Sequence, residues 1–122
     1  MFSPGDVAAI DFPGVAVINR RPAVGLSSEV YHTSRPDVIA GLVTSQVSAA
    51  LGPTDCALQD WAFEGLRVAS AFRCFLATLP SSAHPVLIGH LSERDWQAVR
   101  ACVKAALASL DDPVEPNNSQ PG

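Results

Sequence analysis

One segment late in the chain has the pattern of an amphipathic helix, and it limits what the other residues can form. Its apolar side chains recur three or four positions apart on one face: Trp96, Val99, Val103, Ala106, Leu107 and Leu110. Ser92, with Asp95 three positions later, is similar to a capping box. The pattern predicts a helix over residues 93–109 that packs on the rest of the domain, with Arg100 and Lys104 facing water.

The residues before this helix form short strand-like runs separated by turn residues. Strands are expected at 5–12, 23–26 and 37–46, with further strand pieces at 55–60, 68–79 and 86–91. Loops are expected at 15–20, 27–36, 47–53, 61–66 and 80–85, the fourth with buried aromatic residues. No helical pattern separates the first two strands, so they should pair antiparallel. Strands followed by one helix predict an α+β fold, a small bent antiparallel sheet or barrel.

In the first predicted strand, Val7 and Ala9 should lie on one face and Ala8, Ile10 and Phe12 on the other.

Length and composition predict one folded domain and a short tail. The chain has 122 residues, is 48% hydrophobic and is 16% charged, which is typical of a globular domain. We expect the domain at residues 1–110 and a disordered tail at 111–122, where three prolines and two asparagines occur. No apolar run approaches the roughly 20 residues of a membrane helix, and no signal peptide is present, so a cytoplasmic protein is expected. The three cysteines fit no disulfide or zinc motif and are expected to be reduced.

The net charge of −4 does not exclude a nucleic-acid partner. Three acidic residues, Asp111, Asp112 and Glu115, lie in the expected tail. Without them 8 basic residues face 9 acidic ones, a net charge of −1. A nearly neutral domain can still carry a basic groove, because binding responds to the local field.

Two adjacent arginines precede the second predicted strand. Pro22 fixes its own φ and favours extended geometry at Arg21, so we expect Arg21 to be rigidly mounted where a loop enters the sheet. A guanidinium fork held in this way suits a phosphate. The alternative is a solvated surface arginine. Likewise Thr44, at the end of the third predicted strand, is either a site residue or a residue chosen for β propensity.

Most catalytic motifs are absent from the sequence. There is no glycine-rich phosphate loop, nucleophile elbow or zinc-binding histidine pair, and the histidines are scattered. No cofactor and no metal site are therefore expected. If the sheet brings Arg21, Arg73 and residues 44–46 together, the result is a cationic pocket with hydroxyl and amide donors. Such a pocket suits RNA, which supplies its own nucleophile in the 2′-hydroxyl.

Seven short stretches follow one another in order along the chain: GDV at 5–7, DFP at 11–13, RRPAV at 20–24, LSS at 26–28, VTSQ at 43–46, LATLP at 76–80 and IGHLS at 88–92. Together with the following helix, this ordered set resembles the MazF/PemK toxin family over residues 4–110. The resemblance implies an SH3-like barrel of the CcdB/MazF type with a C-terminal helix, working as a homodimer. It also implies a metal-independent, sequence-selective endoribonuclease (mRNA interferase) of a type II toxin–antitoxin system, which cleaves single-stranded mRNA and is neutralised by an acidic segment of its antitoxin.

The resemblance assigns roles to individual residues. The arginine before proline and the strand-end threonine form the family's catalytic pair, which here are Arg21 and Thr44. Arg21 would stabilise the phosphorane and Thr44 would orient the phosphate. The substrate-binding positions implied are Asn19, Arg20, Ser45, Gln46 and Arg73.

Two positions differ from the family pattern. Residues 14–19 form a short apolar loop where many relatives have a longer polar one, and Phe75 stands where the PemK branch has an acid. Two alternatives therefore stay open: a non-catalytic binding module on the same barrel, and a CcdB-like toxin that acts on DNA gyrase. The presence of both Arg21 and Thr44 favours the nuclease, and the missing acid favours the binding module.

Overall fold

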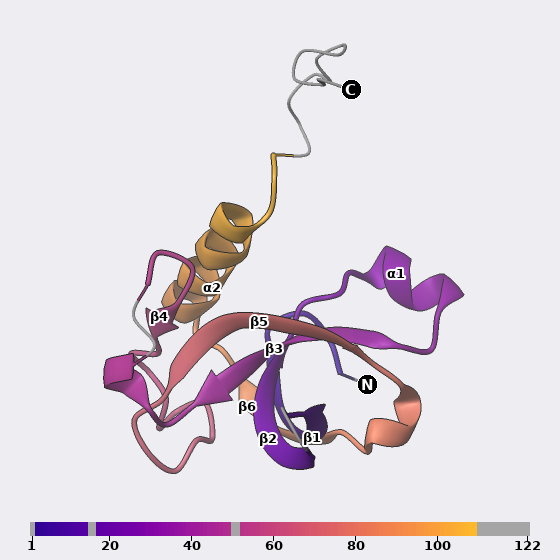
Figure 1. Ribbon diagram of the computed structural model, residues 1–122, viewed down its shortest axis with the longest axis horizontal. Helices are drawn as coiled ribbons and strands as arrows, with labels where there is room; N and C mark the ends of the chain where they lie inside the picture. The colour runs from indigo at the N-terminus through magenta and orange to yellow at the C-terminus, as the bar shows by residue number, and fades with distance from the viewer. Residues whose placement is uncertain (1, 15–16, 50–51, 110–122) are drawn as a thin grey trace.

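The computed structural model describes residues 2–14, 17–49 and 52–109, in which a curled antiparallel sheet carries one long helix (Figure 1). The sheet has six strands in the order β4-β5-β3-β2-β1-β6. The strands are β1 (Asp6–Pro13), β2 (Ile18–Gly25), β3 (Val38–Thr44), β4 (Cys56–Ala57), β5 (Ala71–Leu79) and β6 (Val86–His90). The helices are α1 (Glu29–Ser34) and α2 (Glu93–Ala106), with single 3₁₀ turns η1 (Val47–Ala49) and η2 (Ser81–Ala83). The predicted bent sheet with a C-terminal helix is confirmed.

The first two strands form the predicted antiparallel hairpin, but β2 is longer than expected. Val7 pairs with Val24 at one end and Pro13 with Ile18 at the other. The prediction of a loop up to residue 20 is wrong, because β2 begins at Ile18 and its first four residues are exposed. A solvent-exposed stretch of strand has no hydrophobic alternation to reveal it.

Two buried clusters lie on opposite faces of β1, as the predicted alternation requires. Val7 belongs to the cluster beneath α2, which also contains Val24, Val43, Leu58, Leu66, Phe72, Leu91, Val99 and Cys102. On the other face, Ala8, Ile10 and Phe12 pack with Phe2, Ala23, Val38, Ala40, Leu79 and Ala83. The side chains of β1 thus fill the core on both sides of the sheet.

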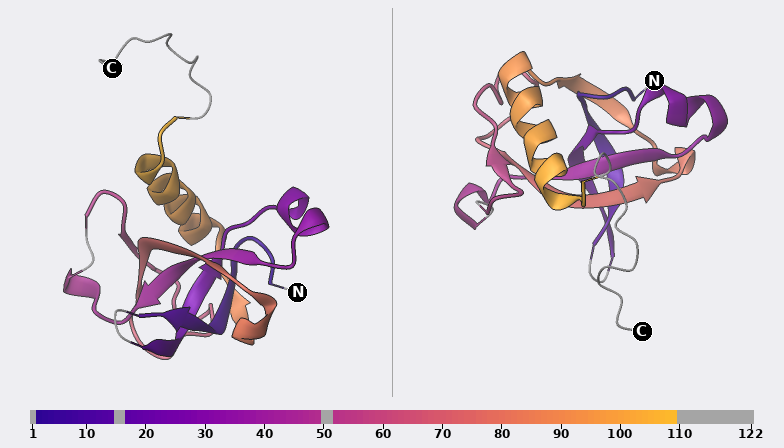
Figure 2. Two further views of the ribbon diagram at one scale, coloured as in Figure 1. Left: turned by 45° about the vertical axis from the view of Figure 1, so that its right-hand side comes forward. Right: turned by 90° about the horizontal axis from the view of Figure 1, so that it is seen from above.

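The helix α2 begins where predicted and ends three residues early. The Ser92 hydroxyl accepts a hydrogen bond from the Asp95 N–H at 3.3 Å, as the capping pattern predicted. Only Asp95, Val99 and Cys102 are buried, and Leu107 after the helix is half exposed. In Figure 2 the C-terminal end of α2 extends past the sheet. Cys102 is the last buried residue of the helix, and Ala106 and Leu107 beyond it are exposed. Leu110 and the predicted tail lie outside the described residues.

Other differences concern short segments. Residues 27–36, predicted as a loop, contain α1, which Ser28 caps by accepting from the Tyr31 N–H at 3.3 Å. The strand predicted at 55–60 is only two residues long, and β5 begins at Ala71 rather than at residue 68. Phe63 is 96% exposed, so the expectation of buried aromatic residues at 61–66 is wrong for this side chain.

The three cysteines, Cys56, Cys74 and Cys102, are free thiols, as predicted. No helix in the described part of the chain is long and apolar enough to cross a membrane.

Candidate active site

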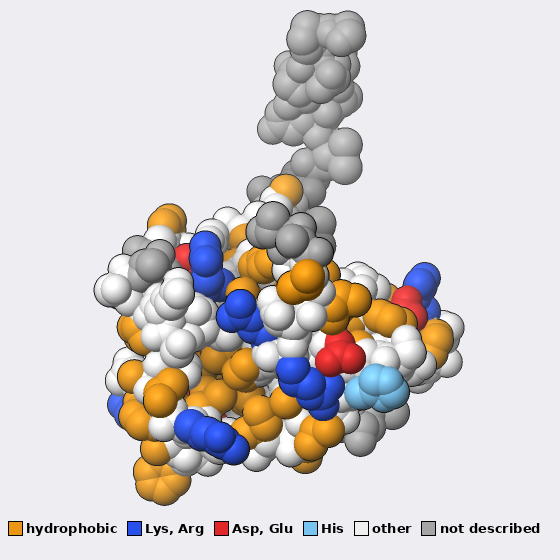
Figure 3. Space-filling view, turned by 60° about the horizontal axis from the view of Figure 1, so that its bottom comes forward, with side chains coloured by type: hydrophobic (Ala, Val, Ile, Leu, Met, Phe, Trp, Pro, Cys, Tyr) orange, Lys and Arg blue, Asp and Glu red, His pale blue; other side chains and the backbone are white. Residues whose placement is uncertain are grey.

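A groove of about 890 Å³ opens between β2, the end of β3 and the segment that leads into β5. Its lining residues are Ala9, Asn19, Arg20, Arg21, Pro22, Val43, Thr44, Ser45, Gly65, Leu66, Arg67, Val68, Ser70 and Ile88. Figure 3 views the molecule from this side and shows a hollow of hydrophobic side chains with Lys and Arg side chains around it. Within the part of the chain that the structure describes, no residue lining this groove is acidic. The groove therefore offers an apolar floor, hydroxyl groups and positive charge.

The two neighbouring arginines differ in their surroundings. Arg20 lies opposite Asp11, and its Nη1 donates to Asp11 Oδ1 at 3.1 Å and to the Ala83 carbonyl at 3.3 Å. Arg21 lies opposite Ile10, is exposed, and makes no side-chain hydrogen bond or ion pair with a described residue. The rigid mounting expected for Arg21 comes from strand pairing rather than from a loop entry. Its guanidinium is free for an external anion, whereas that of Arg20 is already partly neutralised.

Thr44 is held at the end of β3 with its hydroxyl directed by a turn. It pairs with Ala71 of β5 and is 9% exposed. Its Oγ1 accepts a hydrogen bond from the Gln46 N–H at 3.1 Å. Because the hydroxyl oxygen already accepts, its own proton is available to donate to an anionic oxygen. Ser45, next in the chain, is exposed and lines the same groove.

The structure gathers five of the seven residues proposed from sequence, namely Asn19, Arg20, Arg21, Thr44 and Ser45. The other two do not line the groove. Gln46 reaches the site through its backbone N–H, while its side chain is exposed. Arg73 is an exposed residue of β5 opposite Leu42.

At position 75, where the PemK branch of the family has an acid, Phe75 contacts another aromatic ring. Phe75 is half exposed, and its ring centroid lies 5.9 Å from that of Phe12. The nearby surface is therefore apolar rather than acidic.

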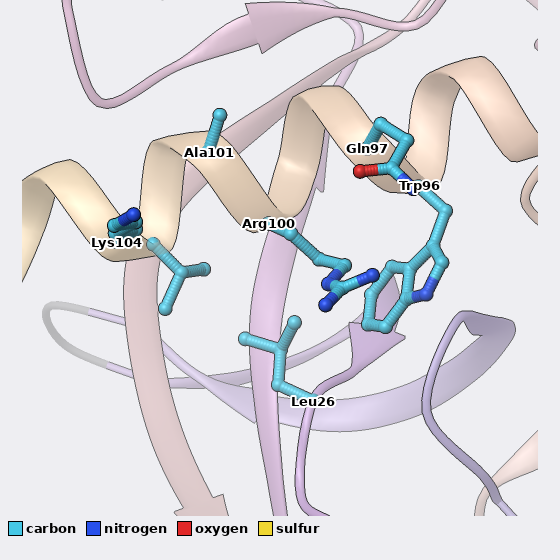
Figure 4. A pocket seen from close by; sticks show the side chains of 7 residues that line it. Leu26, Trp96, Gln97, Arg100, Ala101 and Lys104 are labelled. Carbon is cyan, nitrogen blue, oxygen red and sulfur yellow. The ribbon is translucent and has the colours of Figure 1, made fainter.

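A second groove, of about 560 Å³, lies between α2 and Leu26, which follows β2 (Figure 4). Trp96, Arg100 and Lys104 line it together with Leu26, and the Arg100 guanidinium lies 5.8 Å from the centre of the Trp96 ring. No hydroxyl-bearing side chain is among its lining residues. It therefore lacks the hydroxyl donors that the first groove offers beside its arginines.

Comparison with known proteins identifies the family. Residues 3–107 match the family described as PemK-like, MazF-like toxin of type II toxin–antitoxin systems. The chain belongs to this toxin family. Among curated proteins, no sequence match was found.

Solved structures of MazF toxins have the same fold as this family member. MazF from Deinococcus radiodurans aligns with a TM-score of 0.68 at 20% identity, covering 85% of this chain and 94% of that one. Mycobacterium tuberculosis toxin MazF-mt6 aligns with a TM-score of 0.67 at 20% identity, covering 83% and 94%. An endoribonuclease from a mycobacterial species, in complex with its cognate antitoxin, aligns with a TM-score of 0.66 at 15% identity, covering 85% and 92%. The predicted MazF-like barrel is confirmed.

Sequence reasoning missed one cation of the groove in this MazF-like chain. Arg67 is not among the site residues proposed from the sequence, yet it lines the groove with Arg21 and Thr44. Like Arg21, it is exposed and makes no side-chain hydrogen bond or ion pair with a described residue. Only the fold of residues 58–70 brings it there, so the local sequence offers no signal beyond the charge.

Three carboxyl groups cluster at the start of α2: Asp60, Glu64 and Asp95, with oxygen atoms within 4.8 Å of one another. Asp60 accepts two hydrogen bonds from Arg94, at 2.8 and 2.7 Å, which hold its pKa down to about 2. Glu64 is 1% exposed, and its Oε2 accepts from the Ser92 N–H at 2.8 Å. Burial first, and then the neighbouring Asp95, raise the pKa of Glu64 to about 7.

The carboxyl oxygen atoms of Asp95 and Glu64 differ in their hydrogen bonds. Asp95 accepts from the N–H groups of Gln59 and Asp60 at 3.0 and 2.9 Å. Glu64 Oε1 is buried and has no partner among the described residues. A proton on Glu64 that is shared with Asp95 accounts both for the raised pKa of Glu64 and for the buried Oε1 without a partner.

Proposed function

We propose that this chain is a metal-independent, sequence-selective endoribonuclease that cleaves single-stranded RNA, and that it acts as the toxin of a type II toxin–antitoxin pair. The proposal is carried by one observation. Arg21 and Thr44, 23 positions apart in the sequence, line one groove, and none of its described lining residues is acidic. A free guanidinium and a hydroxyl donor in the same groove are suited to the charge of a phosphodiester.

The chemistry uses the substrate's own nucleophile. The 2′-oxygen attacks the adjacent phosphorus, the bond to the 5′-oxygen breaks, and one proton moves in net from the 2′-oxygen to the 5′-oxygen. The products carry a 2′,3′-cyclic phosphate and a 5′-hydroxyl. Arg21 stabilises the negative charge that develops on the phosphorane. It remains protonated throughout, since an arginine is a poor base.

Thr44 orients the phosphate by donating its hydroxyl to a non-bridging oxygen, and Gln46 supports it through the backbone hydrogen bond. Asn19, Arg20 and Ser45 line the remainder of the groove and contact the RNA on either side of the scissile bond. Arg73 contacts only RNA that continues beyond the groove.

The partners follow from the family. Structures similar to this chain include MazE–MazF complexes from Deinococcus radiodurans and an endoribonuclease with its cognate antitoxin. We infer that a cognate antitoxin also neutralises this chain. We further infer a homodimer, since Val86 and Leu87 of the sheet-edge strand β6 are more than half exposed and large apolar side chains on an edge favour association.

The test is cleavage of a long mixed-sequence RNA in the presence of EDTA. Wild type should give discrete fragments with cyclic phosphate ends, Arg21→Ala should give none, and Arg100→Gln, on the exposed side of α2, should cleave as wild type does. An RNA left intact by the wild-type dimer would overturn the nuclease. Retained RNA binding would then indicate the binding module, and inhibition of gyrase would indicate the CcdB-like activity.

A further inference from the structure

The segment between β4 and β5 forms a closed loop that reaches from α2 to the groove. Its base is closed by the Leu58 N–H, which donates to the Ser70 carbonyl at 2.9 Å. Within it the Glu64 N–H donates to the Asp60 carbonyl at 3.1 Å, and the Leu66 N–H donates to the Trp61 carbonyl at 3.0 Å. These hydrogen bonds make the loop a compact turn rather than a free connection.

Two glycines fix this loop against β6. Gly65 has φ of +90°, and a Cβ there would lie 2.5 Å from Ile88 Cγ2 and 2.7 Å from the Ile88 carbonyl oxygen. A Cβ on Gly89 would lie 2.3 Å from the Glu64 carbonyl oxygen. Side chains larger than hydrogen do not fit at either contact. The backbone at 64–65 therefore lies directly on β6.

Glu64 fixes the loop a second time, to the N-terminus of α2. Its Oε2 accepts from the N–H of Ser92, the helix N-cap, and the side chain is 1% exposed. Asp95 in the first turn of α2 holds the loop from the other side, through the N–H groups of Gln59 and Asp60. The charged groups around Glu64 are Asp95 and Arg94 of α2 and Asp60 of the loop itself.

Arg67 comes directly after this fastened stretch. Leu66 before it is buried in the cluster beneath α2, so the backbone enters the groove from an anchored position. We propose that Arg67 is a second phosphate-binding residue of the groove and that Glu64 is the positioning residue that holds its loop in place. The proposal rests on the RNA-cleaving function proposed above.

The two free guanidinium groups of the groove then have separate tasks. Arg21 binds the scissile phosphate and acts on the transition state. Arg67 binds a neighbouring phosphate of the same RNA strand, which is present equally in the ground state and the transition state. Loss of Arg67 should therefore raise KM and leave kcat nearly unchanged, because it removes uniform binding.

The first experiment compares Arg67→Ala, Arg67→Lys and Arg100→Gln in cleavage of an RNA 10-mer and of a dinucleoside monophosphate, which has a single phosphate. On the 10-mer we expect Arg67→Ala to raise KM about tenfold, which is the size of one charge-assisted contact. Arg67→Lys should recover most of this loss, and Arg100→Gln should match wild type. On the dinucleoside monophosphate Arg67→Ala should equal wild type. An unchanged KM on the 10-mer, or an equal loss on both substrates, would overturn the proposal.

Binding of a non-cleavable 2′-O-methyl RNA 10-mer separates this proposal from the nuclease. Arg67→Ala should weaken binding about tenfold and lower the slope of log Kd against log salt by about 0.7, the value for one phosphate contact on a single strand. If wild type binds this RNA, depends on Arg67 and yet cleaves nothing, the nuclease fails and Arg67 stands. If wild type cleaves RNA and Arg67→Ala binds it as tightly as wild type does, the nuclease stands and the proposed role of Arg67 fails.

The second experiment tests Glu64 through Arg67. Glu64→Ala should raise KM on the 10-mer as Arg67→Ala does, and the double variant should be no worse than either single one, because both changes remove the same contact. Glu64→Gln keeps the acceptor for Ser92 and should bind RNA as wild type does, which guards against a Glu64→Ala chain that fails to fold. Faster amide exchange at 65–68 in Glu64→Ala is also expected. Additive losses in the double variant would contradict the positioning role.

Discussion

Replacing Glu64 by glutamine should change how the stability of the chain depends on pH. The buried carboxyl of Glu64 has its pKa raised from 4.5 to about 7, first by burial and then by Asp95. The folded state therefore holds a proton that the unfolded state releases between these values, and stability falls as pH rises from about 4.5 to about 7. At about 1.4 kcal/mol per pH unit, ionised Glu64 destabilises the folded chain by about 3 kcal/mol above pH 7.

Glutamine keeps the hydrogen bond from Ser92 and can donate its amide to Asp95, but it does not ionise. Relative to wild type, Glu64→Gln should gain about 1.5 kcal/mol between pH 5.5 and pH 7 and about 0.5 kcal/mol more up to pH 8.5, about 2 kcal/mol in all, because Glu64 is only half ionised at pH 7. For a domain of this size, that gain corresponds to a rise in Tm of about 6–10 °C relative to wild type.

The assay is thermal or urea unfolding at several pH values, with Glu93→Gln as the matched control. Glu93 lies in the first turn of the same helix but is exposed, so its replacement removes the same charge without removing a buried carboxyl. Its stability should follow that of wild type at every pH. Parallel curves for Glu64→Gln and wild type would refute the reasoning, because they would mean that Glu64 ionises in the folded state as it does in water.

Substitutions at four further positions separate site residues from structural ones. Arg21→Ala should abolish RNA cleavage at unchanged Tm, whereas Arg20→Ala should retain measurable cleavage and lose stability, since only Arg20 makes contacts in the fold. Thr44→Val should lower kcat by about 10²-fold, and Thr44→Ser should restore most of it, because the serine keeps the hydroxyl. Gly65→Ala should lower the free energy of unfolding by about 1–3 kcal/mol, measured in urea, since it places a Cβ at positive φ against β6; an unchanged midpoint would contradict the tight contact.

The sequence predicts those parts of the fold whose hydrophobic pattern is periodic. In β1 the apolar side chains alternate between the two faces of the sheet, with Val7 on one face and Phe12 on the other. In α2 the spacing of Trp96 and Val99 marks the one face that packs on the core. The start of β2 lacks such a pattern, since its first four residues are exposed. The helix α1 buries no residue, so only its ends give local signals: the N-cap Ser28, the acidic Glu29 in its first turn and the basic His32 in its last.

The candidate site is predictable only where a local rule applies. Arg21 is recognisable beside Pro22, and Thr44 by its place at a strand end. Arg67 is not, because its position depends on the fit of Gly65 and Gly89 against segments distant in sequence. A buried Glu64 also has no local signature, since its partner Ser92 lies 28 residues away.

One strand boundary has a consequence for how recognition can change. Because β2 pairs with β3 only at Ala23–Gly25, residues 18–21 have a strand partner on one side alone among the described residues. The backbone hydrogen bonds that these residues make with β1 do not depend on which side chains the residues carry. Ile18 and Asn19 can therefore vary while the hairpin keeps its ladder intact, and under the proposed function such changes would alter the contacts that the groove makes with RNA.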